Sequence, residues 1–73
     1  MKIDIVYIGN ELIINLSGNY KSEDLLEVER RIDIILNDYD ISNIKFNTDN
    51  VINLNKKNFN YLVEKYHRKL KEA

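Results

Sequence analysis

Two alternating apolar runs joined by Gly9-Asn10 constrain the fold of this chain more than any other feature. The runs, Lys2–Ile8 and Glu11–Ser17, each place apolar side chains at every second position, which is the period of a β-strand. A Gly-Asn pair between such runs predicts a two-residue hairpin, because glycine adopts positive φ freely and asparagine tolerates it.

The apolar pattern also predicts the register of this hairpin. With Ile8 opposite Glu11, one face carries three apolar pairs: Tyr7 with Leu12, Ile5 with Ile14 and Ile3 with Leu16. The other face carries Asp4 with Asn15 and Val6 with Ile13. A slip of one residue would mix polar groups into the apolar face, so the pattern favours this pairing alone.

The segment after the hairpin predicts a helix. Gly18-Asn19 is expected to end the second strand, and Ser22 is suited to cap the helix, with acidic residues in the first turn complementing the helix dipole. Apolar residues then recur at three- and four-residue spacing: Leu25, Val28, Ile32, Ile35, Leu36 and Tyr39. Leu26 and Ile34 lie off this stripe, where they would either pack at its flanks or form a contact surface, and we expect flank packing.

A third strand and a second helix complete the predicted order β-β-α-β-α. Ile41–Thr48 predicts the strand, with Ile44 and Phe46 inward. Asn55 is placed to cap the helix, which has the clearest apolar spacing in the chain: Phe59, Leu62, Val63, Tyr66 and Leu70. Since a crossover between parallel strands is right-handed, both helices should cover one face of a mixed three-stranded sheet.

These elements predict one small α/β (α+β) domain spanning residues 1–73. A chain of this length buries only about 60% of its unfolded surface, so its stability should be marginal. The predicted core combines the inner face of the hairpin with the inner sides of the helices: Ile3, Ile5, Tyr7, Leu12, Ile14, Leu16, Val28, Ile32, Ile35, Phe46, Phe59, Leu62, Val63 and Tyr66.

Charge is divided unevenly along the chain. Residues 1–54 hold five Lys and Arg against ten Asp and Glu, and residues 55–73 hold six against two, so the two parts carry −5 and +4 within the net charge of −1. A basic helix is compatible with nucleic acid, but no arginine-rich groove or aromatic stacking platform accompanies it. We interpret its lysines as a solvated face and expect no nucleic-acid partner.

The sequence indicates a cytoplasmic protein without membrane insertion. The N-terminal stretch MKIDIVYIGNELIINL interrupts its apolar run with Asp4 and Glu11 and has no small-residue cleavage signal, so it predicts neither a signal peptide nor a membrane span. The chain contains no cysteine, which excludes disulfides and is compatible with a reducing compartment.

Residues capable of catalysis are sparse. His67 is the single histidine, and the serines and Thr48 have no base at a suggestive spacing. Glu64 with His67 forms half of a metal pair without further ligands, and the acidic residues near the ends of the first helix and third strand lack a cation-loop pattern. We therefore expect no enzyme activity, no metal and no cofactor.

The junction between the third strand and the second helix is the predicted binding site. Such junctions carry binding residues in open α/β sheets, because helix-terminal N–H groups and loop side chains converge there. The predicted partner-binding residues are concentrated at this junction: Asn53, Asn55, Lys56, Lys57, Asn58, Asn60 and Tyr61.

Two stretches resemble a known family. LIINLSGNY, followed by a capped helix, resembles the "v-L-x-G-x-l" segment of STAS domains, the anti-sigma-factor antagonist fold. IKFNTDNVINLNKKNFNYLVEKY resembles that family's "v-x-l-D-l-s-x-v-x-x-i-D-S-S-G-l-x-x-L-x-x-x-y" without a gap, and the resemblance runs from Ile5 to Lys71.

The diagnostic polar residues of that motif differ in this chain. The family's aspartates fall on Asn47 and Asn55, its two serines on Lys56 and Lys57, its glycine on Asn58 and its leucine on Phe59. One of those serines, or a threonine, is the family's phosphorylation switch. The resemblance therefore implies a STAS-like fold whose helix start cannot be phosphorylated at either position.

Two functions remain open at this stage. The resemblance implies a regulatory interaction module that docks on a protein, of which a sigma-factor regulatory kinase and a transporter ATPase are the partner types. The alternative is a small structural or scaffold subunit that assembles with itself or within a complex. Because family members continue into another strand and helix, we also expect a homodimer or a partner subunit to cover the edge at Ile44–Asn47 or the neighbouring exposed apolar face. The alternative is a short, twisted edge that Lys45 protects.

Overall fold

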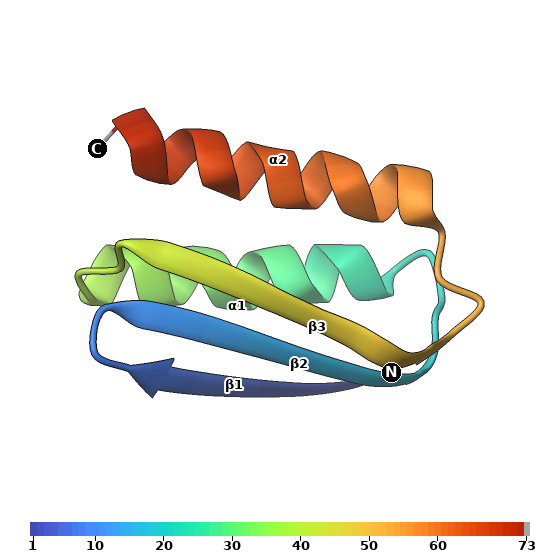
Figure 1. Ribbon diagram of the computed structural model, residues 1–73. Coiled ribbons are helices and arrows are strands. Elements are labelled where there is room, and N and C mark those ends of the chain that lie inside the picture. Colours follow the sequence, from blue (N-terminus) through green and yellow to red (C-terminus); the bar gives the residue numbers. More distant parts are fainter. Residues whose placement is uncertain (73) are drawn as a thin grey trace.

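The computed structural model describes residues 1–72 and shows a three-stranded sheet with two helices (Figure 1). The elements follow the order β-β-α-β-α: β1 Lys2–Ile8, β2 Glu11–Asn19, α1 Asp24–Asp38, β3 Asn43–Ile52 and α2 Lys56–Glu72. This order confirms the predicted α+β class. Ala73, the last residue of the predicted domain, lies outside the described residues.

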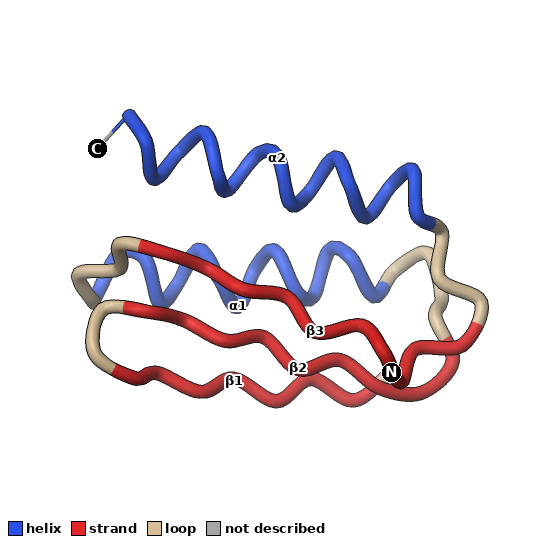
Figure 2. The backbone as a smooth tube through the Cα atoms, viewed as in Figure 1, coloured by secondary structure: helices blue, strands red, loops and turns tan. Residues whose placement is uncertain are grey.

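The sheet has the strand order β1-β2-β3, so β2 is central (Figure 2). β2 is antiparallel to β1 and parallel to β3. The predicted hairpin register is confirmed at every pair, from Lys2 opposite Ser17 to Ile8 opposite Glu11. Gly9 has φ of +61° and Asn10 does not have a positive φ, and a positive φ at the first central position alone is the arrangement of a type II′ turn.

Both strands of the parallel pair, β2 and β3, continue further than the sequence predicts. β2 continues through Gly18 and Asn19, because Gly18 at φ of +97° keeps pairing with β3. β3 runs on to Ile52, and a bulge sets the step of three residues from Asn47 to Asn50 of β3 against the step of two residues from Asn15 to Ser17 of β2. Parallel pairing therefore overrides the local Gly-Asn break signal.

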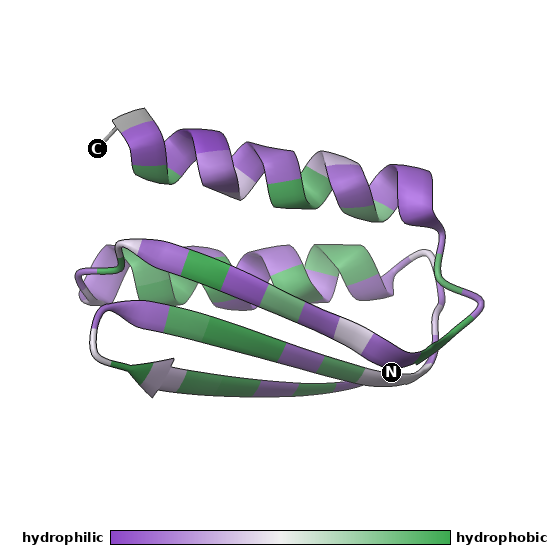
Figure 3. Ribbon diagram, viewed as in Figure 1, coloured by the Kyte–Doolittle hydropathy of each residue, from purple (hydrophilic) through white to green (hydrophobic). Residues whose placement is uncertain are grey.

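The core lies between the sheet and the helices, where green segments of the strands alternate with polar ones (Figure 3). It consists of ten buried apolar side chains: Leu12, Ile14, Leu16, Val28, Ile32, Ile41, Ile44, Phe59, Leu62 and Tyr66. Most of the predicted core is buried or packed against it, including Ile3, Ile5, Ile35, Phe46 and Val63. The core also contains Ile44, whose inward position on the third strand is confirmed, and Ile41, which was not predicted as a core residue.

Three expectations about apolar side chains are wrong. Tyr7 is 46% exposed, because it lies near the end of an edge strand, where the Tyr39 ring lies beside it with ring centroids 5.6 Å apart. Leu26 and Ile34 do not pack at the flanks of α1, since both are exposed on the side of the helix that faces away from the sheet.

A polar cluster joins α1 to α2 beside the core. The Tyr66 ring is fully buried, and its hydroxyl donates to Asp33 Oδ1 at 2.6 Å and to the Glu29 carbonyl oxygen at 3.2 Å. Lys65 forms an ion pair with Glu29, and Lys69 Nζ lies 4.0 Å from Asp33 Oδ1. The hydroxyl of the one large polar side chain in the core is therefore satisfied by the neighbouring helix.

The two helix starts differ from each other. Ser22 is not the cap of α1: Glu23 occupies that position without a side-chain cap, and the Lys21 N–H donates to Asp24 Oδ2 at 2.7 Å. Asn55 does cap α2, as predicted, since its Oδ1 accepts the Asn58 N–H at 3.2 Å. Neither helix within residues 1–72 combines the length and apolar content needed to cross a membrane.

Candidate docking surface at the β3–α2 junction

The carboxyl ends of both parallel strands lie at one end of the molecule, and each leads into a helix start (Figure 1). The two connections are tied together, because the Tyr20 N–H after β2 donates to the Ile52 carbonyl at 2.9 Å. Open α/β folds place their ligands at this end of parallel strands. The structure therefore puts the predicted site at the position that topology favours.

The junction is held firmly by residues on either side of it. Asn53 turns the chain with φ of +63°, a left-handed conformation that asparagine tolerates better than most residues. Leu54 packs against the core. One turn into α2, Phe59 is buried and meets Phe46 edge to face, with ring centroids 5.3 Å apart at 88°. The exposed residues between these anchors are thus carried on a fixed backbone.

All seven predicted partner-binding residues are exposed: Asn53, Asn55, Lys56, Lys57, Asn58, Asn60 and Tyr61. Lys56 and Lys57 make no ion pair with any side chain of residues 1–71. The first turn of α2 contains no acidic residue. Both cations consequently face the positive end of the helix dipole without a compensating charge.

The helix geometry places these residues on different sides of α2. Successive residues of an α-helix are rotated by about 100°, so residues four apart share a side. Lys57 and Tyr61 therefore lie together on the side of α2 that faces away from the core, where Tyr61 is 70% exposed. Asn58 and Asn60 project from nearly opposite flanks, and a flat partner surface cannot contact both.

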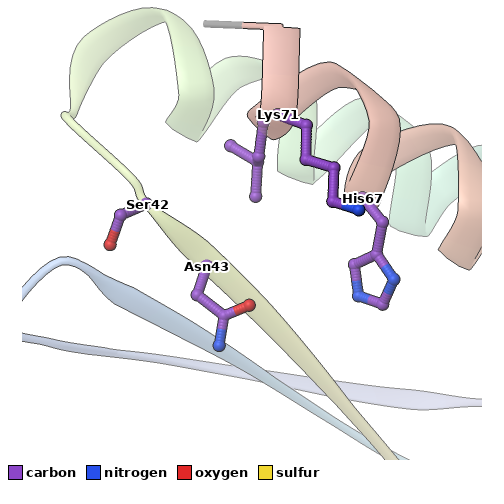
Figure 4. A pocket seen from close by; sticks show the side chains of 5 residues that line it. Ser42, Asn43, His67 and Lys71 are labelled. Carbon is purple, nitrogen blue, oxygen red and sulfur yellow. The ribbon is translucent and has the colours of Figure 1, made fainter.

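A shallow pocket lies at the opposite end of the molecule, between the start of β3 and the end of α2 (Figure 4). Its volume is about 340 Å³, and its lining is Ser42, Asn43, His67, Leu70 and Lys71. The Ser42 hydroxyl points away from the imidazole and donates to the Asn10 carbonyl at 3.1 Å. Ser42 and His67 therefore do not form a nucleophile and base pair.

The sequence analysis did not predict this pocket. Its residues come from segments 24 or more positions apart, and none of them belongs to a recognisable motif. α2 runs antiparallel to β3, which brings the end of the helix beside the start of the strand (Figure 1), so the pocket follows from the return of the chain and not from any local pattern. Among residues 1–71, no group of three His, Cys, Asp or Glu side chains is placed to hold a metal ion.

Among the described residues, four ionisable groups have pKa values moved by their neighbours: Tyr66, Lys65, Glu27 and Arg30, the last of which has its pKa raised by the hydrogen bond to Glu27. Burial, together with the hydrogen bond to Asp33, raises the pKa of the Tyr66 phenol far above its ordinary 10.0. The hydrogen bond to Glu29 raises the pKa of Lys65, and the two arginines Arg30 and Arg31 lower the pKa of Glu27. These groups stabilise α1 and its contact with α2, and none of them lies in the first turn of α2.

Comparison of the chain with models of known protein families, with curated proteins and with solved structures finds no significant match. The resemblance to STAS domains therefore remains a prediction from the residues quoted above. The structure itself establishes the element order, the mixed sheet and the geometry of the β3–α2 junction.

Proposed function

We propose that this protein is a non-catalytic interaction module that docks on another protein through the β3–α2 junction. The observation that carries the proposal is the pair Lys56 and Lys57, exposed and unpaired among residues 1–71, at a helix start. The two lysines lie at the positive end of the helix dipole, which disfavours cations. Within residues 1–71, no ion pair offsets this cost. An acidic partner surface would supply the missing countercharge.

The expected chemistry of docking follows from the exposed side of α2. Tyrosine is enriched at the energetic centres of protein interfaces, because it buries a large ring at low cost in side-chain entropy. Tyr61 lies one turn after Lys57 on the same side of the helix and exposes most of its surface. The two lysines would steer encounter with an acidic surface, and Tyr61 would supply the apolar contact.

Docking of this kind would be constitutive. In the STAS-like alignment, a phosphorylatable serine falls at Lys56 or Lys57, where this chain has no hydroxyl. A serine there switches charge with phosphorylation, whereas lysine is permanently cationic. The partner types implied by the resemblance are a regulatory kinase or an ATPase associated with a transporter, and their docking surface would be acidic.

Charge reversal at the helix start tests the proposal. Lys56→Glu with Lys57→Glu should raise the free energy of unfolding by about 0.3–1 kcal/mol per residue, since acidic residues suit a helix N-terminus. The same change should reduce capture of the partner from source-cell lysate on the immobilised protein. Lower thermal stability combined with unchanged capture would contradict the proposal.

A matched control exists at the other end of α2. Arg68→Glu with Lys71→Glu makes the same change in net charge at exposed positions. Because cations suit a helix C-terminus, this pair should lower stability slightly and leave partner capture intact. Equal loss of capture by both pairs would indicate non-specific charge attraction and would also contradict a docking site at the junction.

A scaffold subunit that self-associates is the second candidate, and one observation favours it. Apolar side chains are exposed along the β1 edge, with Ile8 63% exposed beside Tyr7. Light scattering combined with size-exclusion chromatography measures self-association, and capture of a different protein that depends on Lys56 and Lys57 measures docking. Self-association without such capture would favour the scaffold.

A further inference from the structure

The two edges of the sheet are protected to different degrees. At the β3 edge, α2 runs alongside the strand, Lys45 projects from it, and the bulge interrupts regular pairing (Figure 1). At the β1 edge, the strand of seven residues has no proline and no bulge, and within residues 1–72 no other element lies beyond it (Figure 2). Natural edge strands usually carry such protection against pairing with another chain. The charged side chains Lys2 and Asp4 are the protection that β1 carries.

The turn determines which backbone groups of β1 point outward. Ile8 and Glu11 are the first and last residues of the turn, so they form a hydrogen-bonded pair. Antiparallel pairs alternate, so every second residue back from Ile8 bonds to β2. The N–H and C=O groups of Ile3, Ile5 and Tyr7 therefore point away from the sheet.

These outward N–H and C=O groups can form hydrogen bonds with the same groups of a second copy of the chain. A two-fold axis perpendicular to the sheet at Ile5 would place Ile5 opposite Ile5 of a second copy, and Ile3 opposite Tyr7 in both directions. Every outward N–H and C=O of β1 then has a partner. A shift by two residues one way places Asp4 against Asp4, and a shift the other way leaves Ile3 opposite the glycine of the turn.

The side chains agree with this register. Ile3, Ile5 and Tyr7 share the helix-covered face and are only partly buried within one copy. A mostly apolar cavity of about 300 Å³ opens beside them, lined by Ile5, Tyr7, Leu12, Ile35 and Tyr39. The second copy would bring its own Ile3 and Tyr7 to this edge, which would bury apolar surface on both sides of the axis.

We propose that β1 pairs with β1 of a second copy of this chain, forming a two-fold symmetric dimer with one continuous six-stranded sheet. Both pairs of helices lie on the same face of that sheet. On the open face, Asp4 of each copy lies opposite Val6 of the other. In each copy, the β3–α2 junction lies at the opposite edge of the sheet from β1. The dimer is therefore independent of the docking function proposed above.

Position 6 offers a test that depends on the register. Val6→Asp would place two carboxylates opposite each other across the dimer, whereas Val6→Lys would place an ammonium opposite Asp4. Because two symmetry-related contacts change together, Val6→Asp should weaken dimerisation by about tenfold relative to Val6→Lys. Sedimentation equilibrium from micromolar to millimolar protein measures the dissociation constants, and circular dichroism checks that each variant is folded.

Cysteine cross-linking locates the axis independently, because the natural chain has no cysteine. Opposed residues of a hydrogen-bonded pair lie about 5.5 Å apart at Cα, which permits a disulfide. Ile5→Cys should form a homodimeric disulfide under mild oxidation. Ile3→Cys and Tyr7→Cys should each fail alone and cross-link when mixed.

Three outcomes overturn the proposal. The first is a monomer across the whole concentration range. The second is a dimer whose dissociation constant is the same for Val6→Asp and Val6→Lys. The third is a dimer that Ile5→Cys does not cross-link, which would move the interface to another surface such as the β3 edge.

Discussion

Truncating the Ile14 side chain should clearly lower the free energy of unfolding of this domain. It is fully buried at the centre of β2, between Ile5 of β1 and Phe46 of β3. Ile14→Ala removes three carbon groups, worth about 0.8 kcal/mol each by transfer, and leaves a cavity that β2 cannot collapse into. We expect a loss of about 2–5 kcal/mol, whereas the whole domain should be stable by about 4–11 kcal/mol.

Urea unfolding followed by circular dichroism measures this loss. A change of 1 kcal/mol moves the melting temperature of a domain of this size by about 4–8 °C, so Ile14→Ala should melt at least about 8 °C lower. The control is Ile34→Ala, the same substitution at a side chain that is 52% exposed. It should change stability by less than about 1 kcal/mol, since alanine also has the better helix propensity. Equal effects of the two substitutions would refute the proposed core.

Two further predictions concern the helix caps and the buried tyrosine. Asn55→Ala should lower the free energy of unfolding by about 1 kcal/mol and Ser22→Ala should leave it unchanged, as chemical denaturation can measure. A larger loss from Ser22→Ala than from Asn55→Ala would identify Ser22 as a cap after all. In a spectrophotometric titration, Tyr66 should not ionise near pH 10 in the native protein, so Tyr66→Phe should leave the phenolate signal of the native protein at that pH unchanged. Because the folded-state pKa of Tyr66 is raised, its contribution to stability is complete below its ordinary pKa of 10.0 and is lost as the pH rises above that value. Loss of phenolate signal near pH 10 on Tyr66→Phe would contradict the buried hydrogen bond to Asp33.

The hairpin could be predicted in full because two independent signals agree on it. The apolar alternation and the Gly9-Asn10 turn each favour the same register, and one face of the sheet is buried, which penalises a slip. The same kind of agreement identified α2, where Asn55 and the stripe that begins at Phe59 predict one helix. Elements are predictable where local and tertiary preferences coincide.

The errors arose where tertiary structure competes with a local signal. Gly18-Asn19 has a turn composition, yet pairing with Val51 and Ile52 keeps it in β2. Ser22 is a good capping residue, but the chain enters α1 one residue later. Tyr7 follows the apolar alternation and is nevertheless 46% exposed, because it lies near the end of an edge strand beside a cavity that Ile35 and Tyr39 line but do not fill.

The candidate site was partly predictable. The junction residues are nearly continuous in the sequence, so their proximity follows from the chain itself, and topology predicts the end of the sheet at which they lie. Their orientation required the structure, which separates Asn58 from Asn60 and places Lys57 with Tyr61. The pocket that includes Ser42 and His67 depends on long-range packing and has no local signature.

Site-specific photo-cross-linking tests the docking function most directly. A photoreactive aromatic residue would replace Tyr61 at the junction or, as a matched control, Tyr39 at the end of α1, which is also an exposed tyrosine at 58%. We expect a protein with an acidic surface to be captured from position 61 and not from position 39, and Lys56→Glu with Lys57→Glu to abolish that capture. Capture from position 39 alone, or capture from position 61 that survives the charge reversal, would contradict docking through the β3–α2 junction.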